Sequence, residues 1–212
     1  MINKIDSFFD LSSIKKKQLE KFNNLIKEWN QKINLVSRKD IENFEINHII
    51  HSISISKYID FIGGSDIMDL GTGGGLPGIP LSIIFPSVNF HLVDSKKKKI
   101  DVVNSIIREL KLKNVTTSWS NARDLDKKYD FIISRSVASY TKIIQICSNK
   151  IKKRNKNKLK NGFILLKGGN VEKEFSIATD YKTFDIFEKI KIEFFLSKKI
   201  IYVPNPYNHI DN

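Results

Sequence analysis

The chain has 212 residues, 41% of them hydrophobic, and a formal net charge of +13. This length allows one α/β domain with an appendage and excludes two large domains. The single cysteine, Cys147, excludes an internal disulfide, and no window approaches about 18 apolar residues, so we expect a cytoplasmic protein that does not span a membrane.

The first 64 residues predict a helical extension. Apolar residues recur at helical spacing between residues 13 and 32. A second helical stretch is expected over residues 41–62, closed by the glycine pair at 63–64. We interpret the apolar stripe of the first helix as packing against a main domain that occupies residues 65–212.

A glycine-rich loop follows the first predicted strand. Residues 66–70 form a short apolar strand that contains Asp69, and Gly71, Gly73 and Gly75 come directly after it. Glycines at these steps let the backbone turn tightly and approach a ligand closely, and the N–H groups of the next helix then face that ligand. The unit predicts a nucleotide-like cofactor at the carboxyl end of a parallel sheet.

Two cofactor classes compete for this loop. Residues 73–78 satisfy G-x-G-x-x-G, the fingerprint of a dinucleotide site. However, the tight turn should begin at the strand end, where Asp69 precedes the first glycine and would repel a pyrophosphate. An acid there suits the ammonium and sulfonium of S-adenosyl-L-methionine. We therefore expect S-adenosyl-L-methionine, with an NAD-binding oxidoreductase and a glycine turn without a ligand as alternatives.

The second predicted strand, residues 90–94, ends in the carboxylate of Asp94. An acid about 20 residues beyond a glycine loop is placed to accept hydrogen bonds from a ribose diol. Both candidate cofactors contain that ribose, so Asp94 supports the site without choosing its occupant. The alternative is a helix N-cap, because Ser95 and a helical stretch follow.

From residue 66 onward strands and helices alternate, which implies a parallel sheet covered on both faces. The expected strands are residues 67–70, 90–94, 115–118, 131–134 and 163–166, and the expected helical segments are residues 79–85, 97–110, 122–125 and 143–152. Residues 190–196 and 199–203 predict a terminal antiparallel hairpin, whereas dinucleotide-binding domains end in a parallel strand. The predicted fold class is therefore α/β, a class I (Rossmann-like) methyltransferase with a mostly parallel sheet and a C-terminal antiparallel hairpin.

Two basic runs favour a polyanionic partner. Lys96–Lys99 follows Asp94, and residues 150–160 hold seven bases and no acid. Asparagines interleave in the second run, so we expect a mobile loop before the fifth strand that binds phosphates or is simply solvated. No aromatic residue interleaves there, so this run predicts no base-stacking platform.

Several runs together carry a family resemblance. They are Asn34-Leu-Val-Ser-Arg38, His48-Ile-Ile-His-Ser52, the run from Asp69 to Pro80, Leu92-Val-Asp-Ser95, Ile133-Ser-Arg-Ser-Val-Ala138 and Leu166-Lys-Gly-Gly169. In this order and at this spacing they resemble the RsmG (GidB) family of bacterial rRNA methyltransferases, over residues 15–204. The resemblance implies transfer of a methyl group to N7 of one guanine in 16S ribosomal RNA, free or within the small ribosomal subunit. We expect a monomer.

The loop argument and the resemblance together define an expected cofactor site. Its residues are Asp69, Gly71, Gly73, Gly75, Leu76, Asp94, Ala122, Arg123 and Arg135. The resemblance implies that Gly71 and Leu76 line the pocket. The chain departs from the family at Arg123, where many relatives have an acidic residue, and Asp124 follows one step later.

The expected catalytic residues are Arg135 and Lys167, which match an arginine and a lysine of the family. Arg135 would donate to guanine O6 or to the cofactor carboxylate, and Lys167 would contact a phosphate. Guanine N7 has a free lone pair at neutral pH, so no general base is needed. We expect no metal, because the histidines at 48, 51, 91 and 209 show no metal-ligand spacing. His51 replaces a common aspartate, which we interpret as peripheral. An RNA-binding protein with a vestigial cofactor loop is a further alternative.

Overall fold

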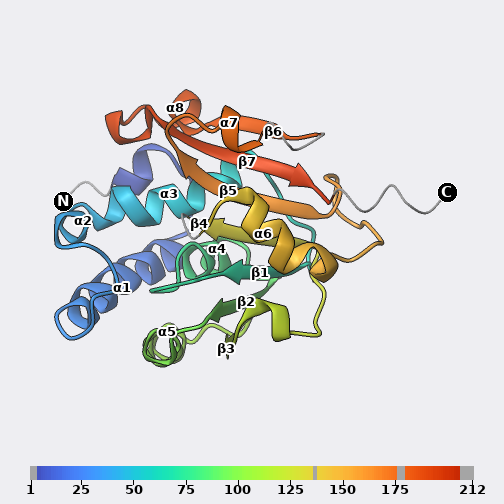
Figure 1. Cartoon of the computed structure of the whole chain (residues 1–212). Helices are drawn as coiled ribbons and strands as arrows, with labels where there is room; N and C mark the ends of the chain where they lie inside the picture. Colours follow the sequence, from blue (N-terminus) through green and yellow to red (C-terminus); the bar gives the residue numbers. More distant parts are fainter. Residues whose placement is uncertain (1–3, 136–137, 176–179, 206–212) are drawn as a thin grey trace.

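A computed structural model describes residues 4–135, 138–175 and 180–205. Within these ranges seven strands form one sheet of order β3-β2-β1-β4-β5-β7-β6 (Figure 1). The strands are β1 (Asp66–Leu70), β2 (Asn89–Asp94), β3 (Val115–Trp119), β4 (Phe131–Arg135), β5 (Gly162–Gly168), β6 (Lys182–Asp185) and β7 (Lys198–Pro204). The first five are parallel, as the alternation of strands and helices along the chain predicted.

The expected C-terminal hairpin exists, but its first strand was predicted wrongly. β7 runs antiparallel between β5 and β6, and β6 is Lys182–Asp185. Residues 190–196 contain a short 3-10 helix, Glu193–Phe195, instead of a strand. Ile190 and Phe195 are the buried residues of that segment, and their spacing of five does not fit the two-residue repeat of a strand.

Helices cover both faces of the sheet. They are α1 (Ser13–Asn30), α2 (Arg38–Glu42), α3 (His51–Ile53), α4 (Gly78–Ile84), α5 (Lys97–Leu110), α6 (Tyr140–Cys147), α7 (Glu172–Phe175) and α8 (Ile186–Lys189). Ile67 packs with the cluster that includes α1, α3, α4 and α5, while its neighbour Met68 packs with α6 and α7. This alternation follows the pleat of β1 and gives the protein one core on each face. None of the helices in the described part of the chain combines the length and apolar character that a membrane span requires.

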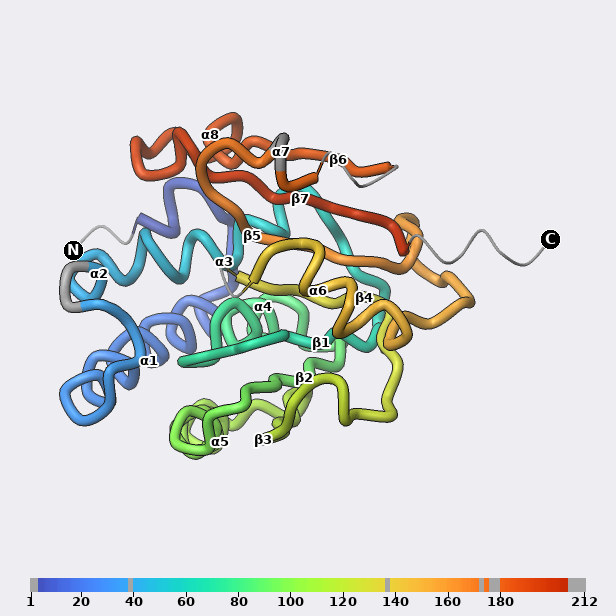
Figure 2. Tube along the Cα trace, viewed as in Figure 1, coloured from blue at the N-terminus to red at the C-terminus, as the bar shows by residue number. Residues whose placement is uncertain are grey.

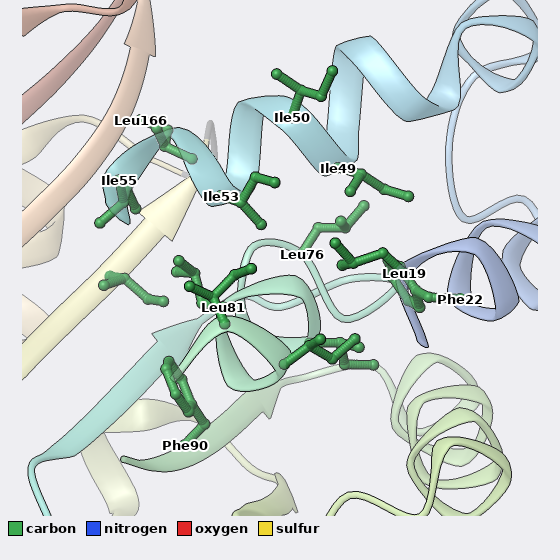
Figure 3. Close-up of a cluster of buried hydrophobic side chains, with 14 of the residues drawn as sticks. Leu19, Phe22, Ile49, Ile50, Ile53, Ile55, Leu76, Leu81, Phe90 and Leu166 are labelled. Carbon is green, nitrogen blue, oxygen red and sulfur yellow. The ribbon is translucent and has the colours of Figure 1, made fainter. Parts of the chain in front are cut away.

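The N-terminal helix α1 is joined to the main sheet by both apolar and polar contacts. Leu19 and Phe22 are fully buried and face Ile49 and Leu76 (Figure 3). Three α1 side chains also donate to carbonyl oxygens at the carboxyl ends of α4 and α5, beside which the trace of α1 runs in Figure 2. These bonds run from Lys15 Nζ to Ile84 O (2.8 Å), from Gln18 Nε2 to Leu110 O (3.3 Å) and from Lys21 Nζ to Glu109 O (2.6 Å). They satisfy carbonyls that a helix end leaves without partners. A domain boundary at residue 64 stays a prediction.

The second helical stretch is shorter and more irregular than expected. It consists of α2, a π-helix over Glu45–Ile50, α3 and a 3-10 helix that ends at Lys57, not at residue 62. The hydroxyls of Ser52 and Ser54 donate to main-chain carbonyls four and three residues back, at 2.6 and 2.7 Å. Side chains that compete for backbone carbonyls in this way disturb regular helix geometry.

Two other helix ends also differ from expectation. α4, expected over residues 79–85, begins one residue earlier at Gly78, with Pro77 as its N-cap, and ends at Ile84. The helix expected over residues 143–152 begins earlier, at Tyr140, and its regular part ends at Cys147. Single-residue propensities place such ends poorly because capping depends on the neighbouring chain.

Candidate active site

A cavity of about 300 Å³ opens at the carboxyl ends of β1 and β2. It is lined by Leu70, Gly71, Val93, Asp94, Ser95, Lys96, Lys99, Ser120, Asn121, Ala122, Ala138, Lys142 and Ile146. The strand order reverses at β1, which lies between β2 and β4. Ligands of open α/β sheets bind at such a switch point, so the fold itself places a binding site here.

The glycine loop folds back on the end of β2. Gly71 N donates to Val93 O at 2.8 Å, and Gly73 N donates to Asp94 Oδ2 at 2.9 Å. A Cβ at Gly73 would make ordinary van der Waals contacts with Lys99 Nζ at 3.8 Å and Gly71 O at 4.0 Å, so no protein atom obstructs this position, although Gly73 is outside the cavity lining. A Cβ at Gly75 would lie 2.4 Å from Ile79 Cδ1. Gly73 therefore leaves room for a ligand, whereas Gly75 lets the loop pack on α4.

Asp69 holds the loop in shape. Its side chain is fully buried, and Oδ2 accepts hydrogen bonds from Thr72 Oγ1 (2.6 Å) and Gly78 N (2.9 Å). Burial raises the pKa of Asp69 to about 6, against the lowering effect of these two hydrogen bonds. The residue is not part of the cavity lining, although Oδ1 has no hydrogen-bond partner among the described residues. Its contact with a cationic group stays a prediction.

Asp94 lines the cavity at the end of β2, as expected. Oδ2 accepts from Gly73 N and Oδ1 accepts from Lys96 N, both at 2.9 Å. The carboxylate thus connects the glycine loop to the turn before α5. Its bond to Lys96 N resembles the helix N-cap that was the alternative role for Asp94. A carboxylate oxygen accepts more than one hydrogen bond, so the same group can still bind a diol.

The structure separates the two residues expected after the third strand. Ala122 is buried and lines the cavity, next to Asn121. The side chain of Arg123 is exposed and outside the lining, and its carbonyl accepts from Lys150 Nζ at 3.0 Å. The exchange of an acid for Arg123 therefore leaves the cavity wall unchanged. Leu76 is likewise outside the lining and lies in the core beneath α1 (Figure 3).

Arg135, at the end of β4, contacts a residue that sequence reasoning missed. Its Nη1 lies 2.7 Å from Nδ1 of His48, on the π-helix. A guanidinium only donates, so His48 Nδ1 accepts and carries no proton. Burial, assisted by the charge of Arg135, lowers the pKa of His48 to about 3. The sequence did contain a sign of this residue, because the run from His48 to Ser52 is one of those that carry the family resemblance. No function for His48, however, was expected from the sequence.

Burial also lowers the pKa of Arg135, to about 10, while the charges of Asp69 and Asp40 raise it. The guanidinium therefore stays charged at neutral pH. π-Helical turns are frequent at functional sites because they displace one side chain from the helical register. His51, one turn further on, is buried against the rings of Phe194 and Phe195. That its exchange for an aspartate is peripheral to the function stays a prediction.

Lys167 is paired inside the protein. Its Nζ donates to Ala138 O at 2.8 Å and to Glu174 Oε1 at 2.7 Å, and the same Oε1 accepts from Tyr140 N. These bonds fix the start of α6, which forms one wall of the cavity. A phosphate contact of Lys167 stays a prediction. Residues 136–137 of the expected motif and His209 lie outside the described residues.

The basic segment at residues 150–160 is held to the protein by contacts of Lys150 and Lys152, while five of its seven basic side chains are exposed. The mobility expected for this segment stays a prediction. Lys150 is buried and donates to the carbonyls of Arg123 and Leu125. Lys152 Nζ lies 2.6 Å from Asp66 Oδ2 and 3.0 Å from Asp130 Oδ2. Asp66 begins β1 and Asp130 precedes β4, so the segment lies at the amino ends of the strands. The cavity is at the opposite, carboxyl, ends.

Comparison with known proteins agrees with this architecture. The family model GidB, described as rRNA small subunit methyltransferase G, matches residues 15–202. The chain is 42% identical to a ribosomal RNA small subunit methyltransferase G of Flavobacterium johnsoniae, over 93% of this chain and 94% of that protein. It is 44% identical to the protein of that name from Phocaeicola vulgatus, over 92% and 94% of the two chains.

Solved structures show the same fold at low identity. M. jannaschii TYW2 in complex with AdoMet gives a TM-score of 0.55 at 15% identity and covers 74% of each chain. A fibrillarin/Nop5p complex gives a TM-score of 0.52 at 14% identity, over 71% of this chain and 78% of that chain. Together with the topology, these likenesses confirm the Rossmann-like α/β fold, and the GidB match identifies it as that of a methyltransferase.

Proposed function

Because this chain belongs to the GidB family, rRNA small subunit methyltransferase G, we propose that it transfers a methyl group from S-adenosyl-L-methionine to N7 of a guanine in 16S ribosomal RNA. The observation that carries the proposal is the family match over residues 15–202, which includes the glycine loop, His48, Arg135 and Lys167. The NAD-dependent and vestigial-loop alternatives are not favoured.

The residues of the cavity fit this cofactor. Asp94 presents a carboxylate to the hollow, and Gly73 leaves its approach open next to Lys99. The cavity volume lies at the lower end of the range of about 300–1,000 Å³ that small-molecule sites occupy. When bound, S-adenosyl-L-methionine supplies a methyl group that its sulfonium already activates. We propose Asp69, Gly71, Gly73, Gly75, Leu76, Asp94, Ala122, Arg123 and Arg135 as the residues that hold it, directly or by shaping the loop.

Arg135 supplies the positioning that this reaction requires. Guanine N7 needs no proton removed, so the protein has chiefly to orient the base, and orientation alone can account for several kcal/mol of a barrier. A guanidinium presents two parallel donors to an oxygen acceptor. Arg135 is charged at neutral pH and is fixed by His48, so it can hold guanine O6 in one orientation. For Lys167 we propose a contact with an RNA phosphate, beside its bond to Ala138 O at the cavity wall.

The partner in this proposal is 16S rRNA, alone or in the small ribosomal subunit, and the protein acts as a monomer in the cytoplasm, where ribosomes are assembled. The test is methylation of small-subunit rRNA by the purified protein, with borohydride and aniline cleavage to locate N7-methylguanine. One modified guanine is expected, together with binding of S-adenosylhomocysteine and none of NADH in calorimetry. Binding of NADH, or no N7-methylguanine on free rRNA or on small subunits, would overturn the proposal.

A further inference from the structure

In the described part of the chain a few large apolar side chains are exposed, and the aromatic one of these is Trp119. It ends β3, the edge strand of the sheet, and is 60% exposed. Its Nε1 nevertheless donates to Ser95 O at 3.1 Å. One edge of the indole is therefore anchored while the ring itself remains accessible to a partner.

The anchor joins Trp119 to the basic run Lys96–Lys99, which directly follows Ser95. Lys97 pairs with Asp101 at 2.8 Å, whereas no ion pair of Lys96, Lys98 or Lys99 is found among the described residues. These three cations therefore remain available to an anionic partner. The chain thus combines here an exposed aromatic ring with available cations, a combination that the sequence of the segment 150–160 lacks.

Two hollows lie on either side of this basic run. Lys96 and Lys99 line the candidate active-site cavity, and Lys98 lines a second cavity of about 390 Å³ between α1 and α5. Trp29 and Arg108 also line the second cavity. A chain of phosphates can therefore pass from one hollow to the other along Lys96–Lys99. The carboxylates that line the two hollows are Asp94, which is buried in the first cavity wall, and Asp101, which is paired with Lys97.

We propose that Trp119 and Lys96–Lys99 form a docking surface for single-stranded RNA beside the active site, with one base stacked on the indole and the phosphates paired with Lys96, Lys98 and Lys99. This deepens the proposed function and rests on it. Single-stranded RNA is recognised by aromatic rings that stack on bases and by cationic grooves that follow the backbone. The surface holds the strand next to the cavity, so that the target guanine enters beside Arg135.

Tryptophan fluorescence tests the stacking step directly. The chain has two tryptophans, so Trp29→Phe leaves Trp119 as the single reporter. Titration with a synthetic single-stranded RNA that contains guanine should quench this variant strongly and quench Trp119→Phe little. Trp119→Ala should weaken RNA affinity about tenfold, and Trp119→Phe should keep most of it because phenylalanine still stacks. The affinity for S-adenosylhomocysteine should stay unchanged in both variants.

A matched pair of triple variants tests the charges. Lys96→Gln/Lys98→Gln/Lys99→Gln should weaken RNA binding and lower the slope of log affinity against log salt by about 2, from about 0.7 per neutralised phosphate contact. Arg154→Gln/Lys158→Gln/Lys160→Gln removes the same charge at the amino ends of the strands and should leave the slope unchanged. Equal losses in both triples would reduce the surface to non-specific attraction and overturn the proposal.

Two further outcomes also overturn it. Fluorescence of the Trp29→Phe variant that does not change on addition of RNA would mean that no base reaches Trp119. Weaker S-adenosylhomocysteine binding by Trp119→Ala, with RNA affinity unchanged, would assign the indole to the cofactor instead. Circular dichroism shows whether each variant is folded. If Trp119→Ala does not fold, the quenching and the RNA affinity of Trp119→Phe test the proposal in its place. These assays do not depend on methyl transfer. If the wild-type protein binds RNA at this surface but does not methylate rRNA, the proposed function is refuted and the docking surface is not.

Discussion

The guanidinium of Arg135 lies 2.7 Å from Nδ1 of His48, although the two residues are 87 positions apart in the chain. This contact joins the end of β4 to the π-helix of the N-terminal region. His48 is neutral and bonded as an acceptor, so it fixes the direction of Arg135 without competing for its charge. The contact thereby ties the N-terminal region to the carboxyl end of β4, where Arg135 is the proposed positioning residue.

Arg135→Ala and Arg135→Lys should both lose most methyl transfer. Lysine keeps the charge but cannot reproduce the planar fork, and loss of a positioning contact can cost on the order of a hundredfold in rate. Single-turnover methylation of small-subunit rRNA with saturating S-adenosyl-L-methionine measures the effect. Wild-type turnover in Arg135→Ala would show that guanine is oriented elsewhere.

His48→Ala should slow the same step about tenfold, because Arg135 loses its fixed orientation. Asparagine can present an acceptor oxygen near the position of Nδ1, so His48→Asn should restore much of the rate. In a double-mutant cycle, His48→Ala should add little to Arg135→Ala, since both remove one interaction. Fully additive losses would contradict a role that acts through Arg135.

Stability should fall as the pH drops below about 6.5, the ordinary pKa of histidine. Burial lowers the pKa of His48 to about 3 and of His91 to about 4, and holds that of His51 well below its ordinary value. In this range the unfolded chain takes up protons that the folded protein does not, so acid favours unfolding by about 1.4 kcal/mol per histidine per pH unit. Asp69, whose pKa is raised to about 6, opposes this with one proton.

Urea denaturation at pH 7.5 and pH 5.5 measures this dependence. If the His91→Asn variant folds, the slope of its free energy of unfolding against pH should be smaller by the equivalent of about one proton. A free energy of unfolding that is flat between these two pH values would show that the three histidines titrate normally in the folded protein.

Gly73→Ala and Gly75→Ala should separate ligand binding from stability. Both glycines have a positive φ, 59° and 88°, which costs an alanine about 1–2 kcal/mol. The Cβ at position 75 would also collide with Ile79, so Gly75→Ala should lose about 1–3 kcal/mol more. Gly73→Ala should stay folded but weaken S-adenosylhomocysteine binding in calorimetry. Unchanged affinity in this variant would exclude Gly73 from the cofactor site.

Lys152→Met should destabilise the protein by about 1–3 kcal/mol, because the carboxylate of Asp130 is buried and depends on this cation. Lys156, 3.5 Å from the same carboxylate, keeps the loss from being larger. The exposed Lys158 provides the control, and Lys158→Met should change stability by less than about 0.5 kcal/mol. Equal stability of the two variants in urea denaturation would show that the segment is solvated and not packed.

The sequence by itself determined the five parallel strands of the sheet and the position of the glycine loop. Apolar runs between helical segments are sufficient for five parallel strands, and parallel strands place their carboxyl ends at one edge. Gly71 and Asp94 therefore had to meet there, as they do in the cavity lining. These features depend on residues close together in the chain, where periodicity and backbone geometry act directly.

The tertiary structure alone decided which distant groups meet. The pairing of β6 with β7, the bond between Arg135 and His48, and the ion pair of Lys167 with Glu174 depend on packing around the two cores. Charge density along the chain also did not distinguish the two basic segments, because a lysine run does not reveal whether buried carboxylates lie beneath it. Lys152 is paired with Asp66 and Asp130 at the amino ends of the strands, whereas Lys96–Lys99 lies beside Trp119 at the cavity, since folding fixes the partners of a charge and sequence fixes only its sign.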